Sequence, residues 1–312
     1  MPSILVTRSL PSSVIARLQE VGVVDVYAEG AMPAEVLRQR VADKDALIAV
    51  VTDDINEGLI DAAARLKVVA NIAVGYNNID VPYARSRGVI VTHTPDVLTE
   101  SVAAFTWGMI LAITRRLAEG DRLVRRQGWK GFALDFMLGS ELKSKQLGLV
   151  GFGRIARAVA ALAPAFGMDV AYTDVTDAGG PFEKMSLDRL LNTSDIVSLH
   201  VPLTPETRHM IDKRALARMK RSAYLVNTSR GPVVEEADLA WALEHHLIAG
   251  AALDVYENEP AVHPDLLPLE NVLLVPHLGS ATTETRMAMA NLAVSNVVAV
   301  LAGRAPLTPV PE

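Results

Sequence analysis

Short apolar runs rich in β-branched residues alternate with stretches of helical periodicity along most of the chain, and this alternation constrains the fold most. Continuous apolar runs of this kind are typical of strands buried on both faces of a sheet. Regular alternation of such strands with helices predicts a parallel α/β architecture. The runs are Ile4–Thr7, Ala46–Val51, Val68–Val74, Val89–Thr92, Leu147–Val150, Val170–Thr173, Ile196–Val201, Tyr224–Thr228, Ala249–Val255 and Val272–Val275.

The segments between the runs show the apolar spacing expected of helices. Arg154–Phe166 and Glu235–His246 are two examples, and Leu98–Arg115 has the composition of a long, largely buried helix. A final helix is expected over Thr282–Leu301. The stretch Gln127–Lys143 has no regular period, and we expect it to be irregular.

Length, charge and composition narrow the class of protein. The 312 residues exceed what one hydrophobic core usually holds, so two domains are expected. A formal net charge of -6 is poorly suited to binding nucleic acid or an anionic membrane over a broad surface. The absence of cysteine excludes disulfides, thiolate nucleophiles and cysteine metal sites. No secretory leader or membrane-spanning run is recognisable, so we expect a cytoplasmic protein.

A glycine-rich turn follows the run Leu147–Val150 and precedes a helix. Its sequence, GFGRIA over 151–156, has the G-x-G-x-x-A form of dinucleotide-binding turns. Gly151 permits the tight turn, and Gly153 lets backbone N–H groups approach a pyrophosphate at the helix N-terminus. Ala156 allows the helix to pack closely on its strand. The same glycines also occur in ordinary strand–helix turns, so the flanking strand and helix matter to the interpretation.

An acidic residue, Asp174, ends the next expected strand, at roughly the 20-residue separation typical of these folds. Its carboxylate would accept hydrogen bonds from the adenosine ribose and repel a 2′-phosphate, so NAD(H) is expected in preference to NADP(H). The alternative is a plain turn residue. His200 ends a further strand and either borders the cofactor or is a satisfied strand-end histidine.

Three later runs end in charged residues, where parallel strands line a ligand crevice. Arg230 follows the first run, Glu257 and Glu259 follow the second, and His277 follows the third. An arginine fork matches a carboxylate, and a histidine held by a carboxylate can donate a proton to a forming oxyanion. This set suits hydride reduction of a 2-oxo acid. On spacing alone Glu257 competes with Glu259, His93 competes with His277, and Arg230 suits a structural ion pair equally well.

Together these segments resemble the D-isomer-specific 2-hydroxyacid dehydrogenases over essentially the whole chain. The resemblance implies two Rossmann-like, doubly wound parallel-sheet domains with the active site in the cleft between them. It implies a discontinuous, flavodoxin-like substrate and catalytic domain at 1–96 plus 278–312, and an NAD-binding Rossmann domain at 97–277. The matching motifs are Asn71–Asp80, Thr94–Ser101, Val150–Ala156, Leu199–Pro205, Asn227–Pro232, Asp254–Pro260 and Pro276–Thr282.

The same resemblance implies roles for the charged residues. Arg230 would bind the substrate carboxylate and carbonyl. Glu259 would pair with His277, which would act as the acid/base, and the similarity favours Glu259 over Glu257. Asp254 would contact the nicotinamide carboxamide.

The resemblance also implies which residues contact substrate and cofactor. The substrate would meet the side chains of Arg230 and His277 and the backbone around Val74, Gly75 and Tyr76. The cofactor would meet Gly151, Gly153, Arg154, Ile155, Asp174, Val201, Pro202, Thr228, Ser229, Asp254, His277 and Gly279.

Within the family, the chain is most similar to glyoxylate/hydroxypyruvate reductases, as the run His263–Leu267, the segment Gly279–Thr282 and the Gly128-Trp129 loop indicate. This implies NADH-dependent reduction of glyoxylate or hydroxypyruvate to glycolate or D-glycerate. D-3-phosphoglycerate, D-lactate and 2-ketogluconate dehydrogenases are alternatives with the same chemistry. An alternative of another class is an NAD(H)-sensing interaction protein, like the corepressors that share this fold.

The family usually forms homodimers through the nucleotide-binding domains, and the irregular stretch bears on this. It carries Trp129, Phe132 and Phe136. These aromatics either pack a dimer contact or reach the active site of a partner subunit. No group of His, Asp and Glu residues shows metal-ligand spacing, so no metal is expected.

Overall fold

The computed structural model describes residues 1–311, which form two compact units. Residues 1–98 and the C-terminal residues from Thr282 make up the first unit, and Thr99–Ala281 make up the second. The predicted junctions, after residues 96 and 277, lie two and four residues before those of the structure. Leu278 and Gly279 belong instead to the second unit, where their N–H groups bond to the carboxylate of Asp254.

The first unit contains a five-stranded parallel sheet in the order β2-β1-β3-β4-β5. Its strands are β1 (Ser3–Val6), β2 (Val23–Val26), β3 (Ala46–Ala49), β4 (Val68–Asn71) and β5 (Ile90–Thr92). Its helices are α1 (Ser12–Gln19), α2 (Ala34–Val41), α3 (Glu57–Ala62), α4 (Val81–Ser86) and α11 (Thr283–Leu301).

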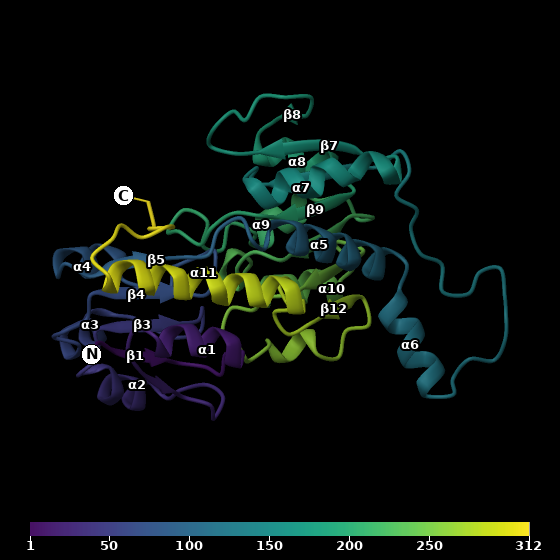
Figure 1. The fold of residues 1–312 in the computed structure, drawn as a ribbon. Helices are drawn as coiled ribbons and strands as arrows, with labels where there is room; N and C mark the ends of the chain where they lie inside the picture. The colour runs from purple at the N-terminus through teal and green to yellow at the C-terminus, as the bar shows by residue number, and fades with distance from the viewer. Residues whose placement is uncertain (312) are drawn as a thin grey trace. The chain divides into compact units, whose positions relative to one another are not determined.

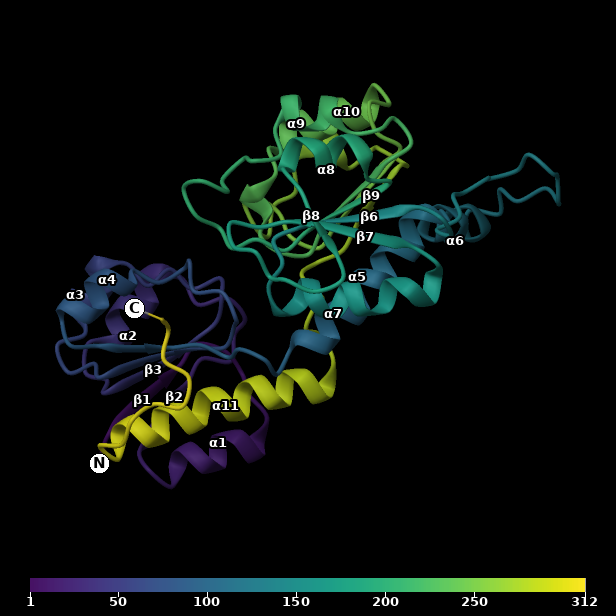
Figure 2. The same ribbon diagram turned by 90° about the horizontal axis from the view of Figure 1, so that it is seen from above.

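Alternate residues of these strands face opposite layers of helices, as the period of two along a strand requires. Ile4 and Ile48 pack in the core beneath α1 and α11, whereas Leu5 and Leu47 pack beneath α2, α3 and α4. Figure 2 shows α1 beside α11 on one face of this sheet and α2, α3 and α4 on the other. The long C-terminal helix therefore completes the core of the N-terminal unit.

The second unit contains a seven-stranded parallel sheet in the order β12-β11-β10-β9-β6-β7-β8. Its strands are β6 (Gln146–Val150), β7 (Asp169–Thr173), β8 (Glu183–Lys184), β9 (Ile196–Leu199), β10 (Tyr224–Asn227), β11 (Gly250–Leu253) and β12 (Val272–Leu274). Its α-helices are α5 (Thr99–Thr114), α6 (Leu117–Arg125), α7 (Arg154–Leu162), α8 (Leu187–Thr193), α9 (Lys213–Arg218) and α10 (Glu236–Glu244). Short 3-10 helices cover Ala163–Phe166, Gly231–Val233 and Pro264–Leu266.

Helices cover both faces of this second sheet (Figure 2). Trp107 of α5 and Val159 of α7 belong to the core on one face, and Leu190 of α8, Leu216 of α9 and Leu239 of α10 belong to the core on the other. Both units are thus parallel sheets between two helical layers, which confirms the predicted doubly wound α/β class. The strand order runs outward in both directions from β6 and β9, and such switch points are where open α/β sheets bind ligands.

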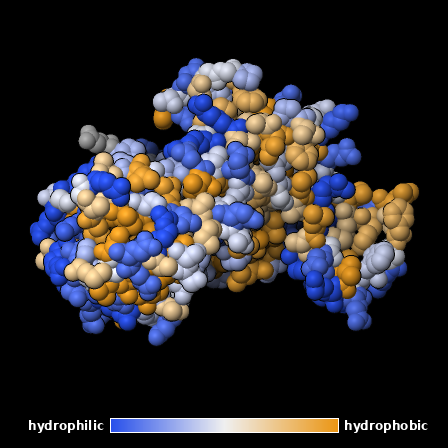
Figure 3. Space-filling model, viewed as in Figure 1, coloured by the Kyte–Doolittle hydropathy of each residue, from blue (hydrophilic) through white to orange (hydrophobic). Residues whose placement is uncertain are grey.

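Helix α6 and the irregular residues 126–141 after it extend away from the sheet of their own unit (Figure 1). Several large apolar side chains here are exposed, among them Phe132 at 85% and Leu134 at 87%. Figure 3 shows hydrophobic residues gathered over this part of the surface. We call α6 and residues 126–141 the arm. Within residues 1–311, no helix has the length and apolar character needed to cross a membrane.

Candidate active site

Arg230, Glu259 and His277 come from the loops that follow β10, β11 and β12, which are neighbours in the sheet. Because the strands are parallel, the three loops meet at one edge. The Nδ1 atom of His277 lies 2.9 Å from Oε2 of Glu259. A carboxylate only accepts, so Nδ1 carries the hydrogen of this bond, and Nε2 is the ring atom left for proton exchange.

The turn that carries His277 is built around a buried carboxylate. His277 has a left-handed backbone with φ 53°, and its N–H donates to the carbonyl of Asp254 at 2.9 Å. The Asp254 side chain is 1% exposed, and it accepts the N–H groups of Leu278 at 2.5 Å and Gly279 at 2.9 Å. Burial raises the pKa of Asp254, although these two bonds oppose the shift. Asp254 supports the turn that carries His277, and its predicted contact with the nicotinamide carboxamide stays a prediction.

Glu259 keeps a negative charge against the imidazole. Burial raises the pKa of Glu259. The opposite effect is larger: the pKa is lowered by the hydrogen bond from His277, by the Tyr256 N–H and by the nearby charge of Arg230, so the net pKa lies below the usual range. Its second oxygen, Oε1, accepts the Tyr256 N–H at 3.2 Å. Glu259 is therefore an ionised, hydrogen-bonded support for His277 at neutral pH.

Arg230 is partly buried beside this pair. Its Nη1 donates to the carbonyl of Ser229 at 2.7 Å, and its own carbonyl accepts the Asn227 side-chain amide at 2.9 Å. Burial lowers the pKa of Arg230 and the charge of Glu259 opposes the shift. An arginine still stays charged at neutral pH. The loop thus holds a fixed positive charge close to the Glu259–His277 pair.

Glu257, the competing carboxylate, faces elsewhere. Its Oε1 lies 2.5 Å from Nε2 of His209, and its Oε2 accepts the Glu236 N–H at 3.1 Å. The structure thus pairs Glu259, and not Glu257, with His277. It also brings His209, Glu235 and Glu257 within 4.8 Å of one another in a geometry that could hold a metal ion. No spacing in the sequence indicates this group, because its members come from three separate loops.

The glycine-rich turn between β6 and α7 fits a dinucleotide. Gly151 has φ +86°, and a Cβ there would lie 2.8 Å from the carbonyl oxygen of His200. Gly153 caps α7, and a Cβ there would meet nothing within 4 Å. The first N–H groups of α7 have no partners in their own helix, so this open space above them suits a pyrophosphate.

Asp174 lies next to this turn at the end of β7. One oxygen accepts the Phe152 N–H at 2.7 Å, and the other accepts the Thr176 N–H at 3.0 Å. Burial raises its pKa, but the bonds from Thr176 and Phe152 outweigh that effect, so the net pKa is lowered. An ionised carboxylate beside the phosphate turn is where a ribose hydroxyl pair would be bound.

Replacing Gly153 with alanine tests this fit. The added methyl group meets no protein atom, so we expect the melting temperature to stay unchanged within about 2 °C. The methyl group would occupy the space above the α7 N-terminus, so we expect the Kd for NADH to rise about tenfold, or roughly 1.4 kcal/mol. Fluorescence titration and thermal denaturation measure both quantities, and unchanged NADH affinity would refute the placement.

The segment after β9 packs against the same turn. The carbonyl of His200 and the side chain of Val201 approach Gly151, and Pro202 follows them. The Nε2 atom of the His200 ring lies 2.9 Å from Oγ of Ser198. Burial lowers the pKa of His200 to about 4. This histidine is therefore neutral at physiological pH, and it supports the turn through its backbone.

A pH effect on stability follows from His200. The folded-state pKa of about 4 lies below the ordinary 6.5, so the stabilisation is complete above pH 6.5 and is lost as the pH falls towards 4. We expect a His200→Gln variant to lose less unfolding free energy than the wild type between pH 7 and 4, by roughly 3 kcal/mol. Urea denaturation at both pH values measures this, and parallel losses would contradict it.

In the first unit, the loop after β4 is held from two sides. The Asn71 side-chain amide donates to the carbonyl of Gly75 at 2.9 Å. The His93 Nδ1 lies 2.8 Å from the carbonyl of Val74, and its ring meets the Tyr76 ring edge-on with centroids 5.5 Å apart. His93 thus supports the predicted substrate loop, a role that sequence reasoning missed when it treated His93 as a rival to His277.

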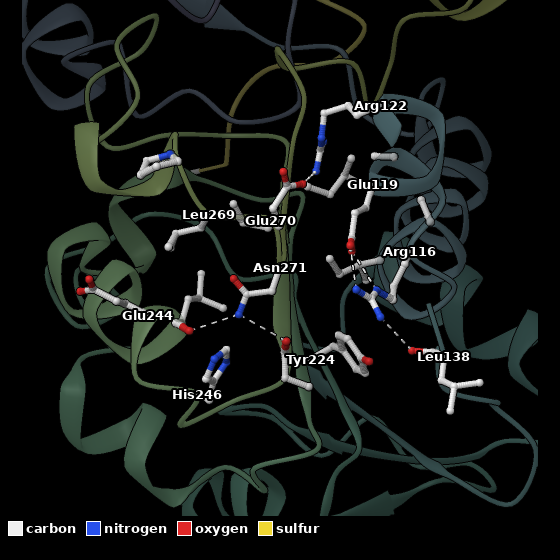
Figure 4. Close-up of a pocket in the computed structure, with 18 residues that line it drawn as sticks. Arg116, Glu119, Arg122, Leu138, Tyr224, Glu244, His246, Leu269, Glu270 and Asn271 are labelled. Carbon is white, nitrogen blue, oxygen red and sulfur yellow. Dashed lines mark hydrogen bonds and ion pairs between the residues drawn. The ribbon is translucent and has the colours of Figure 1, made fainter. Parts of the chain in front are cut away.

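A cavity of about 520 Å³ lies elsewhere in the second unit (Figure 4). Its lining includes Tyr224, which begins β10, and Val272, which begins β12, so it lies at the amino ends of the strands. The candidate catalytic residues follow the carboxyl ends. Two ion pairs, Arg116–Glu119 and Arg122–Glu270, border the cavity. None of the predicted site residues, all of which lie in the described part of the chain, lines it.

Residues 107–279 match the model of the D-isomer specific 2-hydroxyacid dehydrogenase NAD-binding domain. The chain belongs to this family. It is therefore an NAD(P)-dependent oxidoreductase, with its nicotinamide dinucleotide site in the second unit.

Two curated relatives match nearly the full length of the chain. The glyoxylate reductase of Thermofilum pendens is 46% identical over 98% of this chain and 93% of the relative. The glyoxylate reductase of Thermococcus kodakarensis is 45% identical over 98% of this chain and 95% of the relative.

Solved structures also match nearly the whole chain. A protein from Thermus thermophilus aligns with a TM-score of 0.95 and 44% identity, covering 99% of this chain and all (100%) of that one. The NADPH-dependent glyoxylate/hydroxypyruvate reductase of Sinorhizobium meliloti, crystallised with NADP and malonate, aligns with a TM-score of 0.90 and 36% identity. That alignment covers 99% of this chain and 96% of the other. Together these matches support reduction of a 2-oxo acid.

Proposed function

We propose that this protein reduces glyoxylate and hydroxypyruvate with NADH, forming glycolate and D-glycerate. One observation carries the proposal: the 2.9 Å contact between His277 and Glu259, with the charge of Arg230 beside it. This set supplies a proton donor, its support and an anion-binding group at one sheet edge. Near-full-length similarity to glyoxylate reductases favours these acids over larger ones.

Each residue has one task in the proposed reaction. Arg230 binds the substrate carboxylate through its planar fork. The backbone around Val74–Tyr76 stays a predicted substrate contact. When bound, the reduced nicotinamide supplies a hydride to the carbonyl carbon at position 2 of the acid. The Nε2–H of His277 donates a proton to the oxygen of that carbonyl group, and Glu259 balances the charge of the ring before that transfer. In the reverse direction, His277 takes the proton from the hydroxyl group.

The substrate is tested by following NADH oxidation at 340 nm with glyoxylate, hydroxypyruvate, pyruvate, 2-ketogluconate and 3-phosphohydroxypyruvate in parallel. We expect the highest kcat/KM with glyoxylate or hydroxypyruvate. A higher value with 2-ketogluconate, pyruvate or the phosphorylated acid would replace the proposed substrate with that one. Tight NADH binding without turnover of any acid would contradict the proposal and favour an NAD(H)-sensing protein.

The proposed preference for NADH rests on Asp174, whose carboxylate lies beside the phosphate turn. We expect the ratio of kcat/KM for NADH to that for NADPH to fall about tenfold or more in an Asp174→Ala variant, because repulsion of the 2′-phosphate disappears. Steady-state kinetics with both cofactors measure this. A wild-type preference for NADPH, the cofactor of the Sinorhizobium meliloti relative, would refute the assignment.

We also propose that the chain forms a homodimer through the arm. Large apolar side chains rarely stay exposed together unless they form an interface. In the arm, Trp129 is 58% exposed and Leu138 is 66% exposed, and Phe132 and Leu134 are also exposed. Sedimentation equilibrium is expected to give the mass of two chains, whereas the mass of one chain would contradict this. The cytoplasmic location stays a prediction from the sequence.

A further inference from the structure

One histidine outside the catalytic set lies between two carboxylates. The Nδ1 atom of His209 is 2.5 Å from Oε2 of Glu235, and its Nε2 atom is 2.5 Å from Oε1 of Glu257. All three side chains are partly buried, with exposed fractions of 31%, 33% and 15% in that order. Ionised carboxylates only accept hydrogen bonds, so both contacts are hydrogen bonds only when both ring nitrogens carry hydrogen. The geometry is that of an imidazolium cation between two anions.

The backbone of His209 is fixed to the loop between β10 and α10. Its N–H donates to the carbonyl of Pro232 at 2.8 Å. Two residues later, Ile211 exchanges backbone bonds with this loop: its N–H donates to Val233 and its carbonyl accepts the Glu235 N–H, both at 3.1 Å. This loop carries Arg230, so His209 and Arg230 belong to one hydrogen-bonded assembly.

Glu257, the second anion, lies in the other loop, which follows β11 and carries Glu259. Reciprocal bonds tie this loop to the first: the Glu257 N–H donates to the Glu236 carboxylate at 2.7 Å, and the Glu236 N–H donates to that of Glu257 at 3.1 Å. Glu236 is 3% exposed and also accepts the His263 N–H at 3.2 Å. Two carboxylates, those of Glu235 and Glu257, therefore flank His209, and the buried Glu236 links the two loops beside them.

The two loops touch next to the catalytic residues. A Cβ at Gly231 would lie 1.9 Å from the backbone carbon and oxygen of Tyr256, so the backbones meet at that point. Arg230 directly precedes Gly231. The Tyr256 N–H donates to Glu259 at 3.2 Å. A small separation of the two loops would therefore move Arg230 relative to Glu259. It would also disturb the hydrogen bond by which Glu259 supports His277.

We propose that His209 is a positioning residue for catalysis, which ties the Arg230 loop to the Glu259 loop through charged hydrogen bonds to Glu235 and Glu257. The inference rests on the proposed function, because it assigns catalytic roles to the residues that the loops carry. It predicts that loss of the cation leaves carboxylates facing one another, and that the loops then separate.

The test compares wild type with His209→Gln, which keeps hydrogen-bonding atoms but removes the charge. We expect kcat for the best 2-oxo acid to fall tenfold or more, with the Kd for NADH within twofold of wild type. A His209→Gln/Glu257→Gln double variant should recover several-fold of this loss, because it removes the uncompensated anion. The exposed His245, which stacks on Trp241, provides the matched control His245→Gln, expected to behave as wild type.

Hydrogen–deuterium exchange tests the inference independently of turnover. Faster exchange is expected in residues 228–235 and 254–260 of His209→Gln, and slow exchange as in the wild type would overturn the proposal. A wild type that reduces no 2-oxo acid would refute the proposed function, whereas the exchange result would still decide the link between the loops. Glu235→Gln is the second variant if His209→Gln fails to fold. Loss of activity in EDTA, restored by Zn²⁺, would overturn the proposal in favour of a metal site.

Discussion

A His277→Asn variant is expected to retain NADH binding and lose about 100- to 10,000-fold of kcat, the range typical of a general acid. Asparagine is the informative replacement because His277 has a left-handed backbone with φ 53°, which asparagine tolerates better than alanine does. The turn held by Asp254 should therefore persist. Steady-state kinetics at 340 nm and fluorescence titration of NADH measure the two quantities.

The same unit offers a matched control for this variant. His246 also has a left-handed backbone, with φ 52°, and it lines the cavity at the other end of the sheet. His246→Asn is expected to keep wild-type kcat. If His277→Asn kept kcat within about threefold of wild type, the proton donor would have to be another group.

Replacing Arg230 with methionine is expected to lower kcat/KM roughly 30- to 5,000-fold, which corresponds to a loss of about 2–5 kcal/mol of transition-state stabilisation. Two physical effects contribute. The substrate carboxylate loses its charged partner, and Glu259 loses the positive charge that helps to keep its pKa low. We expect the larger part of the effect in the KM for the 2-oxo acid, with the Kd for NADH unchanged.

Arg230→Lys separates charge from shape. Lysine keeps the positive charge but lacks the planar fork, so its kcat/KM should lie between those of the wild type and the methionine variant. Steady-state kinetics over a range of 2-oxo acid concentrations measure all three proteins. A methionine variant with unchanged KM and kcat would assign Arg230 to a structural ion pair, the alternative that the sequence left open.

The interior strands were predictable because burial on both faces leaves a continuous apolar run. Each of the ten predicted runs contains or overlaps a strand. The two strands not predicted, β2 and β8, are both sheet edges. In β2, Val23 is 61% exposed and Asp25 interrupts the run, and β8 consists only of Glu183 and Lys184. An edge position alone does not explain this, because β5 and β12 are also edge strands and were predicted from their apolar runs. No residue of β2 or β8 is buried, so neither sequence carries the buried pattern.

The periodicity of apolar residues predicted where helices lie, but it did not predict where an α-helix changes to a 3-10 helix. The predicted helix Arg154–Phe166 is α7 followed by a 3-10 helix that begins at Ala163. Pro164 explains the change, because proline has no N–H for the helical ladder. The spacing of apolar residues indicates which face of a helix is buried. One turn of a 3-10 helix buries nearly the same face as one turn of an α-helix, so the spacing does not distinguish them.

The candidate site was predictable as far as it depends on strand ends. Parallel topology alone brings the loops of Arg230, Glu259 and His277 to one edge. The choice between Glu257 and Glu259 depends on loop conformation, which spacing does not encode, and only the family resemblance indicated it. The contact of His93 with Val74 and the group around His209 join loops that are distant in the sequence, so neither left a local signal.

The configuration of the glycerate formed from hydroxypyruvate tests the central claim most directly. Chiral chromatography of the product, with NADH consumption followed in the same reaction, is the measurement. We predict D-glycerate in one-to-one proportion to the NADH oxidised, and almost none with His277→Asn. L-glycerate, a racemic product, or NADH binding without any glycerate would contradict the account.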